Sequence, residues 1–429
     1  MSLQEARRLD QRYLMQTYKR APVDLVRGEG MTLYDAEGKA YLDFLAGIGC
    51  VSVGYSNPAV VTAIQDQAAR LGHTSNLFHN ELRGEVAECL NRMLNTLPAE
   101  DAVLGWDDRE ADLSGRVKTQ DAGAHWRSFF ANSGAEANEC AIKLARKYGK
   151  EQLGGAHLVV SLKRSFHGRT LATLAATGQP ALQADFLDEQ ERDAAFLSVP
   201  FGDLEALEQL VCDRARGNVC AVMLECIQGE GGVWPSSVAY LQGLREFCDV
   251  QGILLIIDEV QTGFYRSGSY PMSYAHAGIL PDVVTMAKGI ANGFPCAACA
   301  ARDRFGEVLQ GGDHGSTFGG NLLAMSAARA TLGQMQELGL ALKVSPVGVY
   351  LQSGLAQLAH VSAVRGSGLM VGAQLDCEVA PAVVSRMLEA GFILNATSAE
   401  VLRFLPPLIC TRENCDAMLA QLQTVLEKL

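Results

Sequence analysis

The stretch Gly252-Ile-Leu-Leu-Ile-Ile-Asp-Glu-Val-Gln-Thr-Gly-Phe264 decides the fold class. Its aliphatic residues, Ile253 to Ile257, lead directly into two carboxylates, Asp258 and Glu259. Such a run is typical of a strand buried on both faces, as in a parallel sheet covered by helices. Burying a lone carboxylate costs several kcal/mol unless a cation meets it. We therefore expect a positive charge at the end of this strand.

Similar runs recur through the middle of the chain. Strand-like patterns at 156–168, 219–232 and 281–290 alternate with helical patterns such as 203–216 and 238–252. This alternation predicts βα units and an α/β fold with a mostly parallel sheet. Ligands of such sheets bind at the carboxyl ends of the strands.

The pattern of apolar and polar residues changes after about residue 340, and we expect a small α+β domain ending in a helix there. Residues 31–47 are typical of a hairpin. We predict an N-terminal segment over 1–50 that packs with the small domain, a large domain over 51–335 and a small C-terminal domain over 336–429.

Composition narrows the class of protein. The chain has 429 residues and a net charge of −12, which argues against nucleic acid or an anionic membrane surface as the main partner. The N-terminus has no apolar segment of a secretory signal, and no apolar run approaches the length of a bilayer span. We expect a cytoplasmic protein.

The twelve cysteines favour reduced thiols, because most lie in apolar stretches of a long chain without a signal peptide. One CxxC pair, Cys296 and Cys299, lacks the second pair or the histidines of a zinc site. No metal is expected.

A polar excursion at 98–125 holds seven acidic and three basic residues. It is interpreted as an inserted surface loop, with a lid or contact role as the alternative.

Lys288 ends another strand-like run, thirty residues beyond Asp258. A lysine at the mouth of a sheet is usually a solvated surface residue. Lysine amines also form Schiff bases with pyridoxal phosphate, and that cofactor needs a carboxylate beside its pyridinium nitrogen. Together the two residues predict a pyridoxal phosphate site, in which the protonated pyridine is the cation that Asp258 requires.

The stretch "ANSGAEANE", residues 131–139, offers a phosphate site. Ser133, Gly134 and Ala135 open a helix after a strand-like run, and a helix N-terminus binds anions. Such turns also cap helices without any ligand. Phe166 in "SFHGRT" can stack on a flat ring, and Arg169 can bind a carboxylate through two hydrogen bonds.

With these motifs the sequence resembles the class III, fold-type I pyridoxal-phosphate aminotransferases, most closely their acetylornithine type. The matching stretches occur in the family's order and span nearly the whole chain: "YLDFLAGIG", "NSGAEANECAIKLARKYG", "SFHGRTLATLAATGQP", "IQGEGGVWP", "LLIIDEVQTGFYRSG", "AKGIANGFP", "HGSTFGGN" and "LRFLPPL". The resemblance implies a large domain with a seven-stranded sheet and pyridoxal 5'-phosphate as cofactor.

The resemblance also implies roles for single residues. Lys288 would bind the cofactor covalently and shuttle a proton, Asp258 would pair with the pyridine nitrogen, and Gln261 would bond the ring hydroxyl. Phe166 and Val260 would cover the two ring faces. The implied phosphate contacts are Ser133, Gly134, Ala135 and, from a partner subunit, Thr317. Because this contact of Thr317 would cross from one subunit to the other, the resemblance implies a homodimer with shared active sites.

Transfer of the δ-amino group of N-acetylornithine to 2-oxoglutarate is the implied reaction, in two half-reactions. One site must then accept two differently shaped molecules. Glu225 would mask Arg403 during the amine half-reaction, whereas Arg169 and Ser316 would contact substrate. A structural ion pair between Glu225 and Arg403 is the alternative.

Ornithine aminotransferases carry a tyrosine where this chain has Ile48, which favours an acylated ornithine. Ornithine, succinylornithine and 4-aminobutyrate stay open as substrates. A pyridoxal-phosphate-binding protein without turnover is a further alternative, as is an aminomutase or decarboxylase. The glycines of 366–372 have the wrong spacing for a dinucleotide fingerprint.

Overall fold

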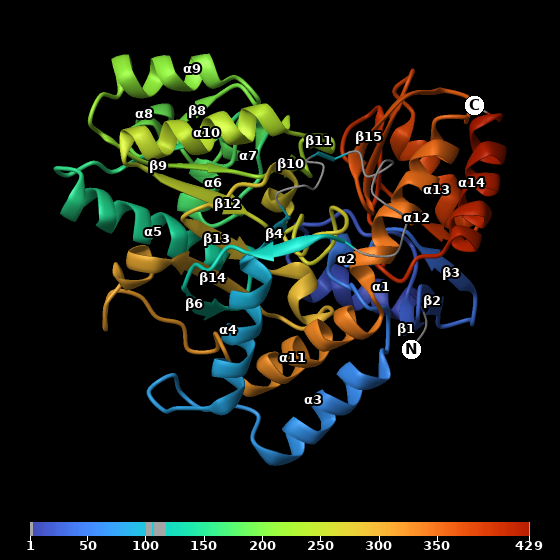
Figure 1. Ribbon diagram of the computed structural model, residues 1–429. Coiled ribbons are helices and arrows are strands. Elements are labelled where there is room, and N and C mark those ends of the chain that lie inside the picture. Colours follow the sequence, from blue (N-terminus) through green and yellow to red (C-terminus); the bar gives the residue numbers. More distant parts are fainter. Residues whose placement is uncertain (1–2, 100–104, 107–116, 429) are drawn as a thin grey trace.

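The computed structural model describes residues 3–99, 105–106 and 117–428. A seven-stranded sheet forms the centre of the larger lobe (Figure 1). β14 runs antiparallel to both of its neighbours, and the other adjacent pairs are parallel. The strands, in sheet order, are β6 (Trp126–Ala131), β14 (Ala297–Arg302), β13 (Val283–Met286), β12 (Leu254–Asp258), β9 (Val219–Leu224), β7 (Leu158–Leu162) and β8 (Phe196–Val199). The predicted α/β fold with a mostly parallel sheet is confirmed.

The aliphatic run of β12 is buried on both faces, as predicted. Leu254 and Ile256 belong to one apolar core, packed with α5 (Gly134–Gln152). Leu255 and Ile257 belong to a second core on the opposite face. Side chains alternate along a strand, so an unbroken aliphatic run is what a sheet covered on both sides requires.

Helices cover both faces of this sheet (Figure 1). α10 (Val238–Gln251) begins at Ser237, whose hydroxyl accepts from the Tyr240 N–H, and ends at the left-handed Gly252. The other helices of this part are α2 (Ala46–Gly49), α3 (Pro58–Arg70), α4 (Glu81–Leu94), α6 (Leu171–Ala176), α7 (Pro180–Gln183), α8 (Glu189–Asp193), α9 (Leu204–Gln209), the π-helix η2 (Leu210–Arg214), the 3-10 helices η3 (Ser273–Ala277), η4 (Lys288–Ala291) and η5 (Asp303–Glu307), and α11 (Leu322–Glu337).

A second lobe is built from the C-terminal residues. Its four-stranded sheet runs β15-β16-β19-β18. The elements are α12 (Leu340–Leu355), β15 (Val361–Ser367), β16 (Met370–Leu375), α13 (Ala380–Glu389), β17 (Phe392–Ile393), β18 (Asn395–Ala396), β19 (Val401–Phe404) and α14 (Arg412–Leu426). The predicted small α+β unit ending in a helix is therefore present.

The N-terminal strands pair with this C-terminal part. After α1 (Leu3–Tyr13), the strands β1 (Leu25–Glu29), β2 (Thr32–Asp35) and β3 (Ala40–Asp43) form a sheet that β17 completes. The antiparallel β2 and β3 make the predicted hairpin. The proposed division of the chain at residues 50 and 335 stays a prediction.

Most of the acidic excursion at 98–125 lies outside the described residues. Its two ends pair with each other, because β4 (Thr96–Pro98) is antiparallel to β5 (Thr119–Asp121). Within it, the Trp106 ring stacks on His276 at 4.9 Å between centroids. A further short pair, β10 (Ile227–Gln228) and β11 (Trp234–Pro235), lies near the junction of the lobes (Figure 1).

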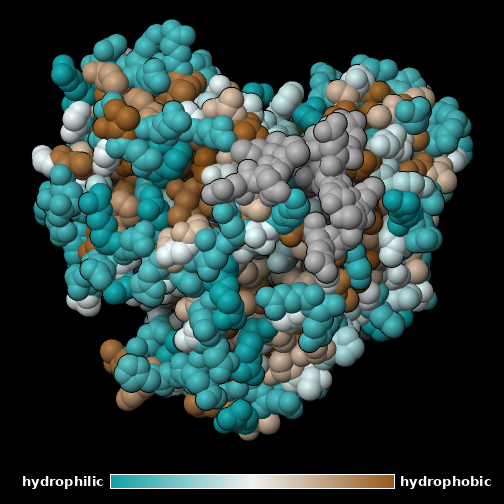
Figure 2. All heavy atoms as spheres, in the orientation of Figure 1, coloured by the Kyte–Doolittle hydropathy of each residue, from teal (hydrophilic) through white to brown (hydrophobic). Residues whose placement is uncertain are grey.

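Polar residues cover most of the face shown in Figure 2, as the burial of the aliphatic runs requires. Nowhere in the described ranges does a helix reach the length and apolarity of a membrane span. All twelve cysteines are free.

Candidate active site

A cavity of about 380 Å³ lies where β12 and β13 end, beside the N-terminus of α5. Ten of the thirteen predicted site residues line it: Ser133, Gly134, Ala135, Phe166, Arg169, Glu225, Asp258, Val260, Gln261 and Lys288. The other three, Ser316, Thr317 and Arg403, are described but are not part of the lining. The fold thus gathers residues from distant segments at the predicted edge of the sheet.

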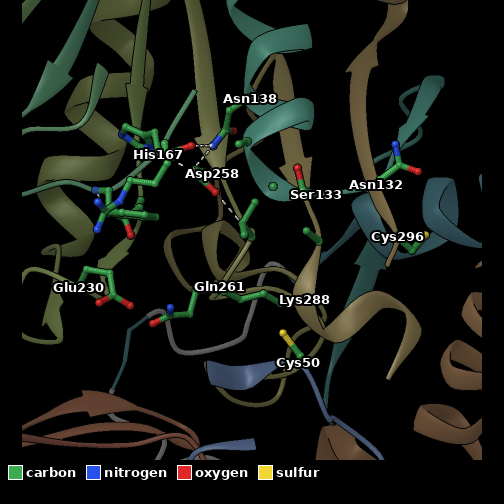
Figure 3. Close-up of a pocket in the computed structure, with 18 of the residues that line it drawn as sticks. Cys50, Asn132, Ser133, Asn138, His167, Glu230, Asp258, Gln261, Lys288 and Cys296 are labelled. Atoms are coloured by element: carbon green, nitrogen blue, oxygen red, sulfur yellow. Dashed lines mark hydrogen bonds and ion pairs between the residues drawn. The ribbon is translucent and has the colours of Figure 1, made fainter. Parts of the chain in front are cut away.

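Asp258 ends β12 and is fixed from two elements. Its Oδ2 accepts a hydrogen bond from Asn138 Nδ2 at 2.8 Å and lies 2.8 Å from His167 Nδ1 (Figure 3). Its Oδ1 accepts from the Val260 N–H at 3.0 Å. Asn138 belongs to α5, and His167 to the loop after β7, so the helix and the loop both hold the carboxylate in place.

His167 is the ionisable partner of Asp258 among the described residues. Burial disfavours a charged imidazole, but the carboxylate of Asp258 outweighs that effect and raises the His167 pKa. His167 Nε2 is buried and has no hydrogen-bond partner among the described residues. The positive charge expected at this strand end is therefore available from the protein itself.

Lys288 lies at the same edge of the sheet. Thr285 of β13 is level with Asp258 in the parallel register, and Lys288 follows three residues later. The φ of Lys288 is 42°, in the left-handed region that side chains other than glycine rarely adopt, and such strain clusters at functional sites. Burial lowers the Lys288 pKa, against the opposing effect of Glu230. The amine is therefore easier to deprotonate than that of an exposed lysine.

The N-terminus of α5 is closed by a capping box and leaves two donors free. Ser133 Oγ accepts from the Glu136 N–H, and the Glu136 carboxylate accepts from the Ser133 N–H. In the described ranges, no acceptor takes the N–H of Gly134 or Ala135. A Cβ on Gly134 would lie 2.7 Å from Val260 Cγ1, so only glycine fits there. Free N–H groups at a helix start bind anions.

The contacts of Arg403 contradict the predicted pairing with Glu225. Its guanidinium is 1% exposed, and Nη1 lies 2.5 Å from Glu230 Oε1. Nε donates to Asn395 Oδ1 at 3.0 Å, and Nη1 to Gln261 Oε1 at 3.4 Å. The expected pairing of Arg403 with Glu225 is wrong, because Glu230 occupies that position.

Glu225 has another place in the site. Its Oε2 accepts from the Phe166 N–H at 3.1 Å, and its Oε1 from the Gly229 N–H at 3.4 Å. Burial raises the Glu225 pKa to about 7. These two contacts direct the Glu225 carboxylate to the backbone at Phe166 and Gly229, and not to Arg403, the partner predicted for it.

The remaining predicted residues lie around the rim. The Arg169 guanidinium lies 5.6 Å from the centre of the Phe166 ring, and Arg169 is exposed. Ser316 Oγ accepts from Asn132 Nδ2 at 3.2 Å, and Asn132 lines the cavity. Thr317 is exposed.

Among the lining residues that were not predicted as site residues are Asn138, His167 and Glu230. A signal existed for the first, because Asn138 stands four positions after Gly134 and so shares its helix face. His167 and Glu230 fall inside quoted motifs, but no spacing rule relates either one to Asp258 or Arg403.

These groups fit one kind of ligand. Free N–H groups suit a phosphate, Asp258 suits a ring cation, Phe166 and Val260 provide apolar walls, and Lys288 provides an amine for a carbonyl carbon. The donor set therefore fits pyridoxal phosphate.

Comparison with known proteins agrees with this assignment of the site. The family model described as Aminotransferase class-III matches residues 13–426. The chain belongs to the class III aminotransferases. This class III aminotransferase has pyridoxal phosphate as its cofactor, as predicted.

Two relatives are acetylornithine aminotransferases. That of Caldanaerobacter subterraneus subsp. tengcongensis is 43% identical over 425 residues, and that of Methanocaldococcus jannaschii is 42% identical over 427 residues. Each alignment covers 98% of both chains.

Solved structures confirm the fold of this class III aminotransferase. An ornithine aminotransferase from Toxoplasma gondii has a TM-score of 0.87 and 28% identity, with 100% of this chain and 94% of that one covered. The acetylornithine aminotransferase from Elizabethkingia anophelis has a TM-score of 0.81 and 30% identity, with 100% and 99% covered.

Proposed function

We propose that this aminotransferase moves the δ-amino group of N-acetylornithine to 2-oxoglutarate, giving N-acetylglutamate semialdehyde and glutamate. The observation that carries the proposal is the single cavity in which Asp258, Lys288 and the start of α5 meet. The full-length relatives named acetylornithine aminotransferase support the choice of amine.

The cofactor site would use the residues already described. Gly134 and Ala135 would donate their N–H groups to the phosphate, and Phe166 and Val260 would enclose the ring. When bound, pyridoxal phosphate supplies an electron sink for the carbon that loses its proton. Asp258 would hold the ring nitrogen in its protonated form, and His167 and Asn138 keep Asp258 oriented.

Lys288 would move the proton. Burial lowers the Lys288 pKa, which favours the neutral amine that can accept a proton at Nζ. Gln261 would bond the ring hydroxyl, and its Oε1 already accepts from Arg403.

Selection between the two substrates would depend on Arg403 and Glu230. Arg403 is 1% exposed whereas Glu230 is 32% exposed, so Glu230 is the partner that can move. With Glu230 in place, the charge of Arg403 is masked and an amine substrate binds. When glutamate or 2-oxoglutarate enters, its α-carboxylate would replace Glu230 on Arg403, and Arg169 would bind the other carboxylate.

The identity of the amine is supported by Ile48, where ornithine aminotransferases carry tyrosine. Free ornithine is the second candidate, because the Toxoplasma gondii structure named an ornithine aminotransferase overlays with a TM-score of 0.87. Succinylornithine and 4-aminobutyrate are the other amines to test.

We also propose a homodimer with shared active sites. Asn76 Nδ2 donates to the carbonyls of Ser316 and Gly319, which joins two segments at one surface. Apolar side chains are exposed on these segments: Leu77 at 89%, Phe78 at 65% and Phe318 at 61%. Exposed apolar groups that cluster mark contact surfaces. Thr317, next to Phe318, would then reach the phosphate of the partner subunit.

The test is glutamate formation from 2-oxoglutarate with each amine in turn. We expect kcat/KM for N-acetylornithine to exceed that for ornithine and 4-aminobutyrate by at least tenfold. A Lys288→Ala variant should form no glutamate and should lose covalent attachment of the cofactor after borohydride reduction, as measured by mass spectrometry. Preference for ornithine would overturn the substrate alone, whereas no glutamate from any amine would overturn the transaminase.

A further inference from the structure

Three metal-ligating side chains of different types meet on the small lobe, outside the active-site cavity. His360 directly precedes β15, and Asp376 and Cys377 directly follow β16. None of the three lines the described cavity. They lie at the open end of the antiparallel β15–β16 hairpin.

The spacing of their ligand atoms suits a small metal ion. His360 Nδ1 lies 3.2 Å from Asp376 Oδ1 and 3.3 Å from Oδ2. Nitrogen and oxygen ligands of tetrahedral zinc lie roughly 3.3 Å apart, since each is about 2.0–2.1 Å from the ion. One ligand atom from each of the three residues lies within 4.8 Å of the other two. A thiolate and a nitrogen on zinc are about 3.6 Å apart, so no pair must close by more than roughly 1.2 Å.

The backbone holds the three residues together. The Asp376 N–H donates to the His360 carbonyl at 3.0 Å. His360 has a φ of 63°, a left-handed conformation that is uncommon for a residue other than glycine. This contact and this turn fix the backbone of both residues with their side chains close together, so part of the ordering cost of binding an ion is already met.

Charge and access favour a cation. Asp376 contributes a carboxylate to the group, and the carboxylate of Glu400 acts on Cys377 from nearby. His360 is 42% exposed and Asp376 53% exposed, so an ion can enter from solvent.

We propose that His360, Asp376 and Cys377 form a zinc site with one nitrogen, one oxygen and one sulfur ligand, completed by water. A His–Asp contact alone is common on protein surfaces, and the added thiol makes the set selective for a borderline metal such as Zn²⁺ over Mg²⁺ or Ca²⁺. Binding releases the thiol proton and leaves the imidazole proton on Nε2. The site would fasten the end of the β15–β16 hairpin to the start of α13.

The test uses the cofactor-loaded protein, reduced and dialysed free of chelators and of excess pyridoxal phosphate. Zn²⁺ affinity is measured by calorimetry, and the alkylation rate of each cysteine by mass spectrometry with and without Zn²⁺. Cys212 is the control, since it is exposed, at least as accessible as the partly buried Cys377, and belongs to no metal-ligating group in the described ranges. The variants are Cys377→Ser, His360→Asn, which tolerates the left-handed turn, and Cys212→Ser.

We expect one Zn²⁺ per chain, at least tenfold weaker binding in Cys377→Ser and in His360→Asn, and unchanged binding in Cys212→Ser. Zn²⁺ should slow alkylation of Cys377 by at least tenfold and leave Cys212 unaffected. Transaminase activity should be equal in all variants, which shows that they fold. Unchanged affinity in either ligand variant, equal protection of Cys212, or no binding by the wild type would overturn the proposal.

Discussion

The ion pair between Glu230 and Arg403 gives the sharpest prediction. Replacing Glu230 by glutamine keeps the shape of the side chain but removes the charge that masks Arg403. Glutamate and 2-oxoglutarate no longer have to displace a carboxylate, so we expect both to bind more tightly. An amine substrate gains nothing from the change, and its carboxylate can now be captured in an unproductive position.

The size of the effect follows from the contact. A hydrogen bond to a charged group contributes about 1.5–3 kcal/mol. The 2.5 Å contact is short, but Glu230 is 32% exposed, so solvent compensates part of its loss and we take the lower end of that range. Because about 1.4 kcal/mol corresponds to tenfold in affinity, KM for glutamate should fall by about tenfold. Arg403 is 1% exposed, so Arg403→Ala should do the opposite and abolish glutamate binding.

The assay follows the two half-reactions separately, with glutamate and with N-acetylornithine as amino donors in single-turnover experiments. Glu225→Gln is the control, because Glu225 accepts from backbone N–H groups and does not touch Arg403. We expect this control to slow both half-reactions alike, through Phe166. If Glu225→Gln selectively strengthened glutamate binding while Glu230→Gln did not, the masking role would belong to Glu225 and our reasoning would fail.

Three further variants test the supports of the site. Gly134→Ala should lower the melting temperature, although alanine is normally the better helix former, because its Cβ would lie 2.7 Å from Val260 Cγ1; adding Val260→Ala should restore it. His167→Leu should destabilise the cofactor-free protein by about 3 kcal/mol in denaturant unfolding, since it leaves the carboxylate of Asp258 without its buried cationic partner. Glu259→Gln should change the pH dependence of unfolding. Burial raises the Glu259 pKa to about 7, so its stabilising effect is complete below pH 4.5 and is lost as the pH rises through 7. The variant should therefore gain stability relative to wild type over this window, by up to about 1.4 kcal/mol per pH unit. An equal slope in both proteins would count against this explanation.

The sequence predicted the sheet and its functional edge because both depend on local patterns. Unbroken aliphatic runs mark strands buried on both faces, and β12 is such a strand. In a parallel register, residues that follow neighbouring strands emerge at the same edge. Asp258 and Lys288 therefore line one cavity although they are thirty positions apart in the sequence.

The sequence failed where side-chain direction decides the contact. Glu225 and Glu230 are five residues apart in one loop segment, and both precede the small lobe that carries Arg403. No periodicity tells which of them reaches the guanidinium. In the fold, the Phe166 and Gly229 N–H groups occupy the Glu225 carboxylate, so only Glu230 is left to meet Arg403.

The group that meets the Asp258 carboxylate at the end of β12 also depends on how the whole chain folds. His167 precedes Asp258 by 91 residues, and their contact exists only because β7 and β12 end at the same edge of the sheet. The Asp258 carboxylate raises the pKa of His167, so this pair lets Asp258 be buried without the full cost of an isolated charge. The site can then remain preorganised, and binding energy from the cofactor need not be spent on folding it. The same pairing explains why the strand could end in aspartate at all: its first cation comes from the neighbouring loop, and the ring nitrogen is the second.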